Sequence, residues 1–498
     1  MKRLTWLILL LVLLCGCVID TDTGSCAHKD GNSDGICDSC RESVMTTFDI
    51  YSVNDLHGKI ADGSDHPGVD ELTTYLEKAR QTDDNVILLS AGDMWQGSWE
   101  SNLTDGLLTT DWMNEVGFTA MTLGNHEFDW GEEMIGKNAE FAQFPLLAIN
   151  VYDRQTDMPV PYCHSSVVVE FDGIQVGIIG AVGDCYSSIA PEKVADVYFK
   201  TGPQLTELVK QESLRLRNSG VDFVVYCLHD GYGESVPAEE FLSRGLMASY
   251  YDAFLSDGYV DLVFEGHTHQ QYVLRDFYGV YHLQNRGDNR GGISHAEVSI
   301  NTVTGDFSVD VKELVKHHTY SSLEEDPVVG ELLEKYGEII AAGTEVLGTN
   351  GQWQDSDDLG ELVAYLYYRL GHEEWGREYE VVLGGGLVSV RSPYNLEPGR
   401  VTYGQLQTLL PFDNDIVLCS IRGSDLLERF LNNDNRKYFI CHDEGLAARI
   451  QRNEIYYIVV DTYTSSYAPN RLTVVEKYEP GIYARDLLAE HIRNGGLE

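Results

Sequence analysis

Five short apolar segments of this chain each run directly into side chains of the kinds that bind metal ions. The segments, each with the polar residues that follow it, are Phe48–Val53 with Asp55 and His57, Val86–Ser90 with Asp93, Ala120–Leu123 with Asn125 and His126, Phe223–Leu228 with His229, and Leu262–Phe264 with His267 and His269. Apolar runs of this length are typical of strands buried in a sheet. Because the carboxyl ends of strands in an open α/β sheet share one edge, these five sites should converge there.

The segments between these strands predict a layered α/β domain that also contains antiparallel strands. The predicted elements are helices over Gly68–Arg80 and Gln204–Asn218, a hairpin of Val167–Phe171 and Gln175–Ile179 joined by Asp172-Gly173, and a second hairpin that turns at Thr304-Gly305.

The residue types at the strand ends suit a metal site with imidazole and carboxylate ligands and no thiolate, which favours zinc, manganese or iron. Asp93 offers two carboxylate oxygens and could bridge two ions, and Asn125 offers a neutral carbonyl oxygen. Each fragment alone is a weak signal, since an Asp-x-His pair is usually a surface turn. The whole set, in this order and at strand ends, indicates a metal centre.

The same order of motifs resembles the calcineurin-like metallophosphoesterases. Within them, the segments Gly92–Gly97 and Gly124–Asp129 resemble the bacterial and animal 5′-nucleotidases, and the resemblance extends roughly from Thr47 to the C-terminus. It implies a four-layer α/β/β/α metallophosphoesterase domain followed by a C-terminal α/β substrate-binding domain. It also implies two divalent ions, zinc, manganese or similar, whose bridging hydroxide attacks the phosphorus.

The resemblance assigns residues to these roles. One ion would be held by Asp55, His57, Asp93 and His269, and the other by Asp93, Asn125, His229 and His267. His126 would stabilise the transition state or protonate the leaving group, and Asp129 would orient it.

The C-terminal half resembles the substrate-binding domain of 5′-nucleotidases less closely. The residues implied to meet the nucleotide are Arg391, Phe412, Asn414 and Tyr463, with the two aromatic rings enclosing the base. Leu383 stands where the family has Asn, and Thr464–Pro469 replaces a Gly-Gly-Asp-Gly segment. The phosphatase motifs are therefore intact while the specificity motifs are altered, which leaves the nucleotide open.

The N-terminus has the pattern of an export signal. Lys2 and Arg3 precede an apolar run over Leu4–Leu14, which is too short to span a membrane. The segment Leu14-Cys15-Gly16-Cys17 resembles a bacterial lipobox, which implies a lipid on Cys17 and a membrane-anchored lipoprotein at the cell surface or in the periplasm. Simple secretion with cleavage elsewhere is the alternative.

A short module rich in Cys and His follows the signal. Cys26, His28, Cys37 and Cys40 have the spacing of a structural zinc site, although disulfides would also staple so small a module. An EF-hand-like loop begins at Asp30, but Arg41 stands where calcium would need a Glu. The other five cysteines, which lie in apolar strands and are expected to be buried thiols, are Cys163, Cys185, Cys227, Cys419 and Cys441.

The predicted organisation is therefore a signal peptide (1–17), a stalk (18–46), the metallophosphoesterase domain (47–325), a linker (326–346) with one helix over Asp326–Ala342, and the C-terminal domain (347–498).

The charge balance limits the partners. Lys and Arg number 35 against 79 Asp and Glu, which gives a formal net charge of −44. Such a chain repels polymeric nucleic acid and an anionic bilayer, but two metal ions would still attract a small phosphate ester. The predicted function is removal of the 5′-phosphate of nucleotides. The alternatives are a 2′,3′-cyclic nucleotide phosphodiesterase, a UDP-sugar diphosphatase, or a nucleotide-binding surface lipoprotein without activity; the sequence does not predict the oligomeric state.

Overall fold

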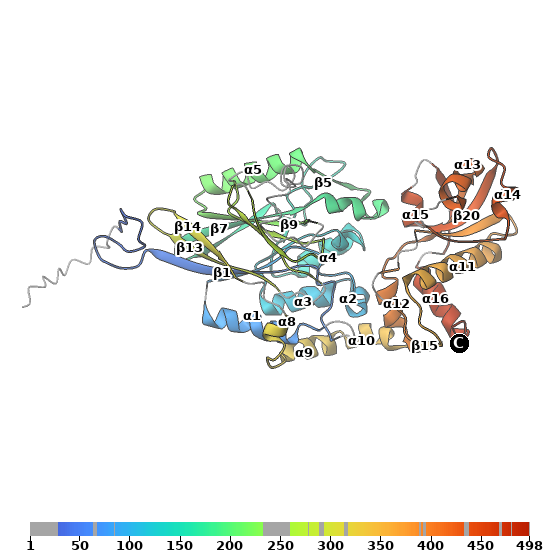
Figure 1. Cartoon of the computed structure of the whole chain (residues 1–498), viewed down its shortest axis with the longest axis horizontal. Helices are drawn as coiled ribbons and strands as arrows, with labels where there is room; N and C mark the ends of the chain where they lie inside the picture. Colours follow the sequence, from blue (N-terminus) through green and yellow to red (C-terminus); the bar gives the residue numbers. More distant parts are fainter. Residues whose placement is uncertain are drawn as a thin grey trace, which may run out of the picture.

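The computed structural model describes residues 28–62, 67–83, 85–232, 259–276, 278–287, 293–312, 317–387, 390–391, 395–432, 438–467, 471–479 and 481–497. The predicted signal peptide, the lipidation site Cys17 and the candidate ligand Cys26 lie outside these residues. The described residues form two bodies that follow one another along the long axis of the molecule (Figure 1).

The first body contains two six-stranded sheets. The first sheet has the order β14 (Phe307–Val311), β13 (Ser294–Asn301), β1 (Met45–Val53), β2 (Val86–Ser90), β3 (Ala120–Thr122) and β4 (Leu146–Leu147). The second has the order β11 (Tyr272–Arg275), β12 (Tyr281–Gln284), β10 (Leu262–Glu265), β9 (Phe223–His229), β7 (Ile174–Val182) and β6 (Ser166–Phe171). The strands β1 to β4 are mutually parallel, as are β7, β9, β10 and β12, so their carboxyl ends share an edge.

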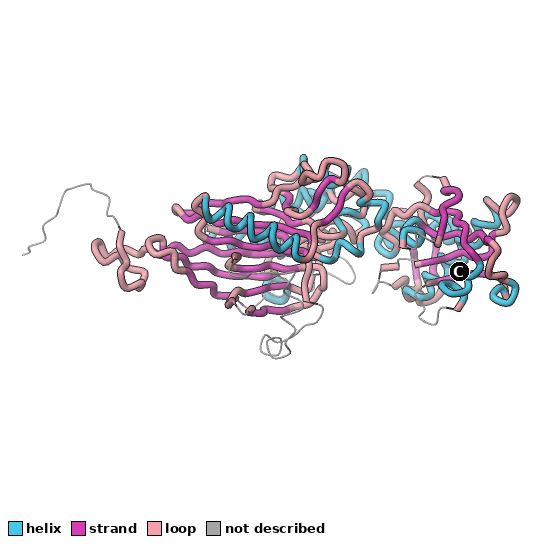
Figure 2. The backbone as a smooth tube through the Cα atoms, turned by 90° about the horizontal axis from the view of Figure 1, so that it is seen from above, coloured by secondary structure: helices cyan, strands magenta, loops and turns pink. Residues whose placement is uncertain are grey.

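The two sheets pack face to face, and helices cover their outer faces (Figure 1, Figure 2). Between the sheets, the ring of Phe48 on β1 meets the ring of Phe223 on β9 edge-on, with 5.9 Å between centroids. The outer helices are α1 (Asp70–Thr82), α3 (Leu107–Val116) and α4 (Glu132–Phe141) on the first sheet and α5 (Pro203–Asn218) on the second. Three apolar cores thus separate four layers, and the predicted α/β/β/α fold is confirmed.

The predicted local elements are confirmed with small shifts of their ends. The five apolar runs form β1, β2, β3, β9 and β10. The first hairpin pairs Ser166 with Ile179 through Phe171 with Ile174, and its turn places Asp172 at φ 47° and Gly173 at φ 82°. Positive φ at both turn residues matches the right-handed twist of the strands. The second hairpin pairs β13 with β14.

The prediction of one continuous helix over Asp326–Ala342 is wrong. The segment forms α9 (Pro327–Lys335), α10 (Gly337–Ile340) and the 3₁₀ turn η4 (Ala341–Thr344). The helix α9 begins after Asp326, whose side chain caps it by accepting from Val328 N. It ends at Tyr336, directly before Gly337. Glycine costs about 1 kcal/mol in a helix interior, which favours the break at that point.

The second body is a five-stranded sheet with helices on both faces. Its strand order is β19 (Phe439–His442), β16 (Val381–Gly386), β20 (Ile455–Asp461), β18 (Ile416–Arg422) and β21 (Leu472–Lys477). One face is covered by α11 (Ser356–Glu374), α12 (Tyr403–Leu409) and α16 (Ala484–Arg493), and the other by α13 (Gly423–Leu426), η5 (Leu427–Leu431) and α14 (Leu446–Arg449). This is the predicted C-terminal α/β domain.

The remaining elements are short. They are α2 (Trp99–Leu103), η1 (His126–Phe128), β5 (Val151–Asp153), η2 (Asp184–Ser188), η3 (Pro191–Val194), β8 (Val197–Phe199), α8 (His317–Tyr320), β15 (Val346–Asn350), β17 (Gly399–Thr402) and α15 (Thr462–Ser466). Across the described residues, no helix combines the length and the apolar character needed to cross a bilayer.

Candidate active site

The polar residues after β1, β2, β3, β9 and β10 come together at the shared edge of the two sheets. His57 Nε2 lies 3.1 Å from His269 Nε2, and His269 Nε2 lies 3.3 Å from Asp55 Oδ1. On the other side, His229 Nε2 lies 3.1 Å from Asp93 Oδ2 and 3.2 Å from Asn125 Oδ1.

His267 completes the predicted set, because one of its ring nitrogens lies within 4.8 Å of the nearest ligand atoms of His229 and Cys185. Donor atoms of Asp55, Asp93 and His229 likewise lie within 4.8 Å of one another. All seven residues predicted to be metal ligands are therefore brought together.

The backbone at these positions is strained. Five of the predicted ligands have positive φ angles between 52° and 72°, namely Asp55, His57, Asp93, His267 and His269. A non-glycine residue in this region costs about 1–3 kcal/mol, and such strain concentrates at functional sites. The strain turns each side chain out of its strand direction toward one point, which is how an Asp-x-His or His-x-His pair can aim both members together.

Two imidazoles are oriented by backbone carbonyls. Nδ1 of His57 donates to Gln96 O at 2.9 Å, and Nδ1 of His229 donates to Ala91 O at 2.6 Å. The bond at His229 fixes the hydrogen on Nδ1 and turns Nε2 toward Asp93, as in metal-binding histidines generally.

The centre is buried and strongly charged. Asp55, His57, Asp93 and His229 expose at most 1% of their surface. Burial opposes the charged form of His229, but the neighbouring Asp93 outweighs it and raises the pKa of His229 to about 10. Burial likewise acts against the Asp93 anion, yet the charges of His229 and His126 hold the pKa of Asp93 well below its usual range. Buried carboxylates need such positive partners, and metal ions would provide them.

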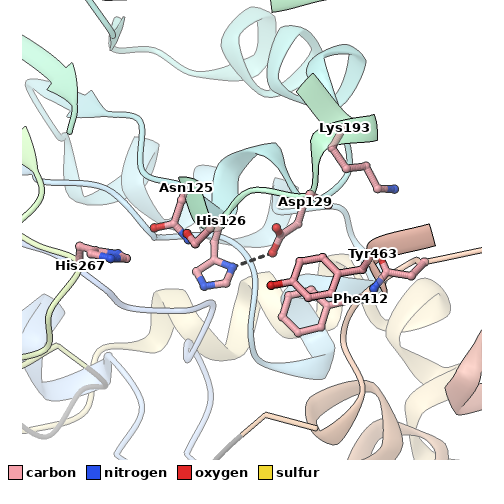
Figure 3. Close-up of a pocket in the computed structure, with 10 residues that line it drawn as sticks. Asn125, His126, Asp129, Lys193, His267, Phe412 and Tyr463 are labelled. Atoms are coloured by element: carbon pink, nitrogen blue, oxygen red, sulfur yellow. Dashed lines mark hydrogen bonds and ion pairs between the residues drawn. The ribbon is translucent and has the colours of Figure 1, made fainter. Parts of the chain in front are cut away.

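His126 and Asp129 form the predicted pair beside the metal ligands (Figure 3). Nδ1 of His126 donates to Asp129 Oδ2 at 2.7 Å, and the backbone N of His126 donates to Asp93 Oδ1 at 2.9 Å. Burial would lower the pKa of His126, but Asp129 and Asp93 together raise it above its ordinary value. The pair therefore holds a ring that can donate a hydrogen bond or a proton from Nε2.

A pocket of about 240 Å³ opens beside His126. Its lining combines residues of both bodies, namely Asn125, His126, Asp129, Ser188, Ala190, Lys193 and His267 from the first and Phe412, Asn414 and Tyr463 from the second. The ring of Phe412 stacks against that of His126, with 6.1 Å between centroids. Three of the four predicted substrate residues therefore lie in one pocket that reaches the metal ligands (Figure 3).

Arg391, the fourth predicted substrate residue, lies against the metal ligands and not in the lining of that pocket. One of its terminal nitrogens donates to the side-chain oxygen of Gln96, and the other lies 2.7 Å from Nδ1 of His57. The C-terminal body thus delivers a guanidinium directly to the buried centre.

Residues 48–271 match the calcineurin-like phosphoesterase family. This part of the chain is a calcineurin-like phosphoesterase domain. Endonuclease YhcR of Bacillus subtilis (strain 168) is 26% identical to the chain over 414 residues, which are 76% of this chain but only 32% of that protein. The chain thus matches about a third of the length of that curated relative.

Two further alignments cover most of this chain and most of the protein it is compared with. The 5′-nucleotidase of Vibrio vulnificus (strain CMCP6) is 25% identical over 412 residues, which are 73% of this chain and 70% of that protein. The structure of a 5′-nucleotidase precursor from Thermus thermophilus has the same fold, with a TM-score of 0.65 over 90% of this chain and 96% of that chain at 16% identity. These findings confirm the predicted family resemblance and the two-domain α/β fold. The phosphoesterase is a metal-dependent phosphoric ester hydrolase.

Sequence reasoning missed several residues of the phosphoesterase site. The carboxylate of Glu127 is fully buried and accepts hydrogen bonds from the backbone of both ligand-bearing loops. Its position in the Gly-Asn-His-Glu segment was the available signal. Lys193 reaches from the first domain and donates to Asp413 O at 3.2 Å, a contact between residues 220 positions apart that no local pattern reveals.

The expectation that five cysteines are buried thiols holds only in part. Cys185, Cys227 and Cys419 are buried, but Cys163 and Cys441 are partly exposed. Cys185 lies beside the predicted metal ligands, where its Sγ donates to His229 O at 2.9 Å.

Proposed function

We propose that this protein is an exported phosphomonoesterase that removes the 5′-phosphate of nucleotides with the help of two divalent metal ions. The observation that carries the proposal is the meeting of a buried His/Asp/Asn cluster with an aromatic pocket at His126. A phosphate placed on the cluster leaves the rest of its substrate in the pocket between the two domains.

The donor set of this chain fits two ions of the zinc or manganese type, since it combines imidazoles, carboxylates and one amide oxygen. Asp55, His57, Asp93 and His269 would hold one ion, and Asp93, Asn125, His229 and His267 the other. When bound, such ions neutralise phosphate charge and supply a hydroxide nucleophile at neutral pH.

The protein's own groups position the substrate and handle the leaving group. Asp129 fixes Nδ1 of His126, so Nε2 is the atom that donates toward the phosphoryl or leaving oxygen. Arg391 brings a fixed positive charge to the edge of the metal ligands. Phe412 and Tyr463 offer ring faces for a nucleobase, and Asn414 offers an amide for its polar edge.

In the C-terminal domain, the segment that differs from the family motif is held by hydrogen bonds next to the pocket. Residues Thr462–Ser466 form α15, which Asp461 caps by accepting from Thr464 N. The hydroxyl of Thr464 accepts from Leu387 N at 3.0 Å and so holds the end of the glycine-rich strand β16. The hydroxyl of Tyr467 donates to Ser187 O across the domains at 3.2 Å. This arrangement holds α15, which brings Tyr463 to the wall of the pocket.

Export and anchoring belong to the same proposal. The N-terminal pattern supports a signal peptide over residues 1–17 and a lipid on Cys17, and the domain limits at 47–325, 326–346 and 347–498 are proposed with it. The substrate would then be an extracellular or periplasmic mononucleotide, because the net charge of −44 disfavours a polymer.

A hydrolysis panel tests the substrate class. Metal-stripped protein is supplied with zinc, manganese or calcium and offered nucleoside 5′-monophosphates, 2′,3′-cyclic nucleotides and UDP-sugars, with phosphate release and product chromatography as readouts. We expect turnover of the 5′-monophosphates with zinc or manganese. Faster turnover of cyclic nucleotides or UDP-sugars would replace this substrate class. Tight nucleotide binding without turnover of any ester would favour a binding lipoprotein.

Replacing Phe412 by leucine tests the stacking role. Because an aromatic face on a base contributes about 1–3 kcal/mol, KM for AMP should rise by about 5–150-fold while kcat changes little. Ribose 5-phosphate, which has no base, serves as the control substrate and should be hydrolysed equally by both proteins. An equal loss on both substrates would contradict the assignment.

A further inference from the structure

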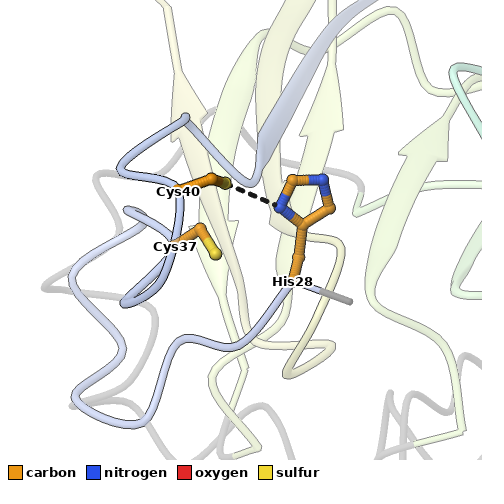
Figure 4. A group of neighbouring side chains, drawn as sticks. All are labelled: His28, Cys37 and Cys40. Carbon is orange, nitrogen blue, oxygen red and sulfur yellow. Dashed lines mark hydrogen bonds between the residues drawn. The ribbon is translucent and has the colours of Figure 1, made fainter. Parts of the chain in front are cut away.

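The N-terminal module contains a second group of metal-binding side chains. His28, Cys37 and Cys40 bring one donor atom each to within 4.8 Å of the others, although they are separated by up to 12 residues (Figure 4). This group shares no residue with the phosphoesterase site. Two thiols and an imidazole form a softer donor set than the carboxylates and imidazoles of that site, and soft sets favour zinc.

The spacing of the donors matches a tetrahedral ion. With Zn–S near 2.3 Å and Zn–N near 2.0 Å, a sulfur and a nitrogen bound to the same zinc at the tetrahedral angle lie about 3.5 Å apart. The observed distance from Cys40 Sγ to His28 Nδ1 is 3.4 Å. His28 and Cys40 therefore already stand at the spacing of two ligands of one ion, and the Cys37 sulfur lies within 4.8 Å of both donor atoms.

The Cys37 side chain is held in place by its surroundings. Cys37 is fully buried, and backbone N–H groups of Cys40 and Lys29 point at its sulfur. The turn is closed by Arg41 at φ 65°.

The module is fixed to the body at the end opposite the active site. It precedes β1, whose nine residues carry the chain about 30 Å to the catalytic edge. Figure 1 shows the module beyond the start of β1, with the C-terminal domain at the other end. An ion in the module therefore lies far outside the catalytic centre.

Asp30 makes the connection between the module and the first sheet. Its Oδ2 accepts from Asn301 Nδ2 of β13 at 2.6 Å and from Gly35 N at 2.8 Å, while its Oδ1 accepts from Asp34 N at 3.1 Å. Asp30 therefore acts as a clamp that joins the module to the first sheet. Thr302 N also donates to Val44 O, which ties the β13–β14 turn to the module.

We propose that His28, Cys37 and Cys40 bind a structural zinc ion that folds the N-terminal module onto the β13–β14 end of the phosphoesterase domain. The ion closes a module too short to have its own core, and it gives the chain a rigid base next to the proposed lipid anchor.

The test uses cobalt in the full-length protein, purified in detergent. A thiolate–cobalt bond gives a strong near-ultraviolet charge-transfer band, which ligands of the Asp, Asn and His type do not give. We expect this band in the wild type and its loss in the double variant Cys37→Ser/Cys40→Ser. Elemental analysis of zinc-loaded protein should show one zinc fewer per chain in that variant, with phosphatase turnover retained.

Two controls keep the result decisive. Cys185→Ser removes the thiol beside His229 and should leave the cobalt charge-transfer band unchanged. The proposal is overturned if the band is lost in Cys185→Ser but kept in Cys37→Ser/Cys40→Ser. If the double variant does not fold, a mercurial thiol reagent should release one thiolate-bound zinc from the wild type. If no zinc is released and the intact mass is lower by two hydrogen atoms than that of the reduced protein, the cysteines form a disulfide. This result would also overturn the proposal.

Discussion

Alanine in place of His126 is expected to lower kcat for AMP by about 10²–10⁴-fold, the usual contribution of a positioned general acid or hydrogen-bond donor. The reason is local. His126 is the one ring of the cluster, among the described residues, that is held by Asp129 through Nδ1 and that also faces the pocket. Its removal takes away the donor to the phosphoryl or leaving oxygen without removing a proposed metal ligand, so the metal content should stay at the wild-type level.

The leaving group distinguishes the two roles of His126. A nucleoside leaves as a basic alkoxide and needs a proton, whereas p-nitrophenolate does not. If His126 protonates the leaving group, His126→Ala should lose much less activity on p-nitrophenyl phosphate than on AMP. Equal losses would assign it to stabilising the transition state. Asp129→Asn should show a smaller loss of the same kind, because the ring remains present but is less well oriented.

The matched control is His164→Ala, which removes an exposed imidazole of the same domain and should leave kcat unchanged. Elemental analysis of each variant shows that metals are bound. Wild-type turnover of AMP by metal-loaded His126→Ala would rule out the proposed role.

The sequence predicted which polar side chains meet at this site better than it predicted their supports. Asp55, Asn125 and His267 could be grouped because each closely follows an apolar strand, and parallel strands end at a common edge. Their backbone angles were not predictable in the same way, since the strain at Asp55 and His267 is held by tertiary contacts. The carbonyl of Gln96, which orients His57 from 39 residues away, has no local sequence signal.

The domain interface shows the same limit. Phe412 and Tyr463 were identifiable through family resemblance, but the placement of Lys193 beside them depends on how two domains meet. The break of the linker helix at Tyr336 comes directly before Gly337, a poor helix former that apolar periodicity does not register. Motifs thus predicted which side chains meet at the site, while tertiary structure determined what holds them.

Glu127 is the clearest of these supports. Its Oε2 accepts from Asp93 N at 2.9 Å and Gly124 N at 2.6 Å, and its Oε1 accepts from Met94 N at 2.8 Å and Trp95 N at 3.3 Å. One buried carboxylate therefore joins the loop after β2 to the loop after β3. Burial, together with the charge of Asp93, raises its pKa to about 7, against the effect of the N–H donors.

Glu127→Ala is expected to destabilise the fold and the metal site together. Each buried N–H that loses its acceptor costs about 1–3 kcal/mol, so the free energy of unfolding should fall by at least about 3 kcal/mol. Because the loops that carry Asp93 and Asn125 lose their common anchor, metal affinity should fall by about 10–100-fold. Urea unfolding and metal titration of the stripped protein measure the two effects.

Two variants separate positioning from simple packing. Glu127→Gln keeps the volume of the side chain, but its amide nitrogen would face two N–H donors. We therefore expect the metal affinity of Glu127→Gln to be nearly as low as that of Glu127→Ala. Glu140→Ala removes an exposed carboxylate at the end of α4 and should change neither quantity. If Glu127→Gln instead matched the wild type in both measurements, the four N–H donors would not need a carboxylate, and the assigned role of Glu127 would be wrong.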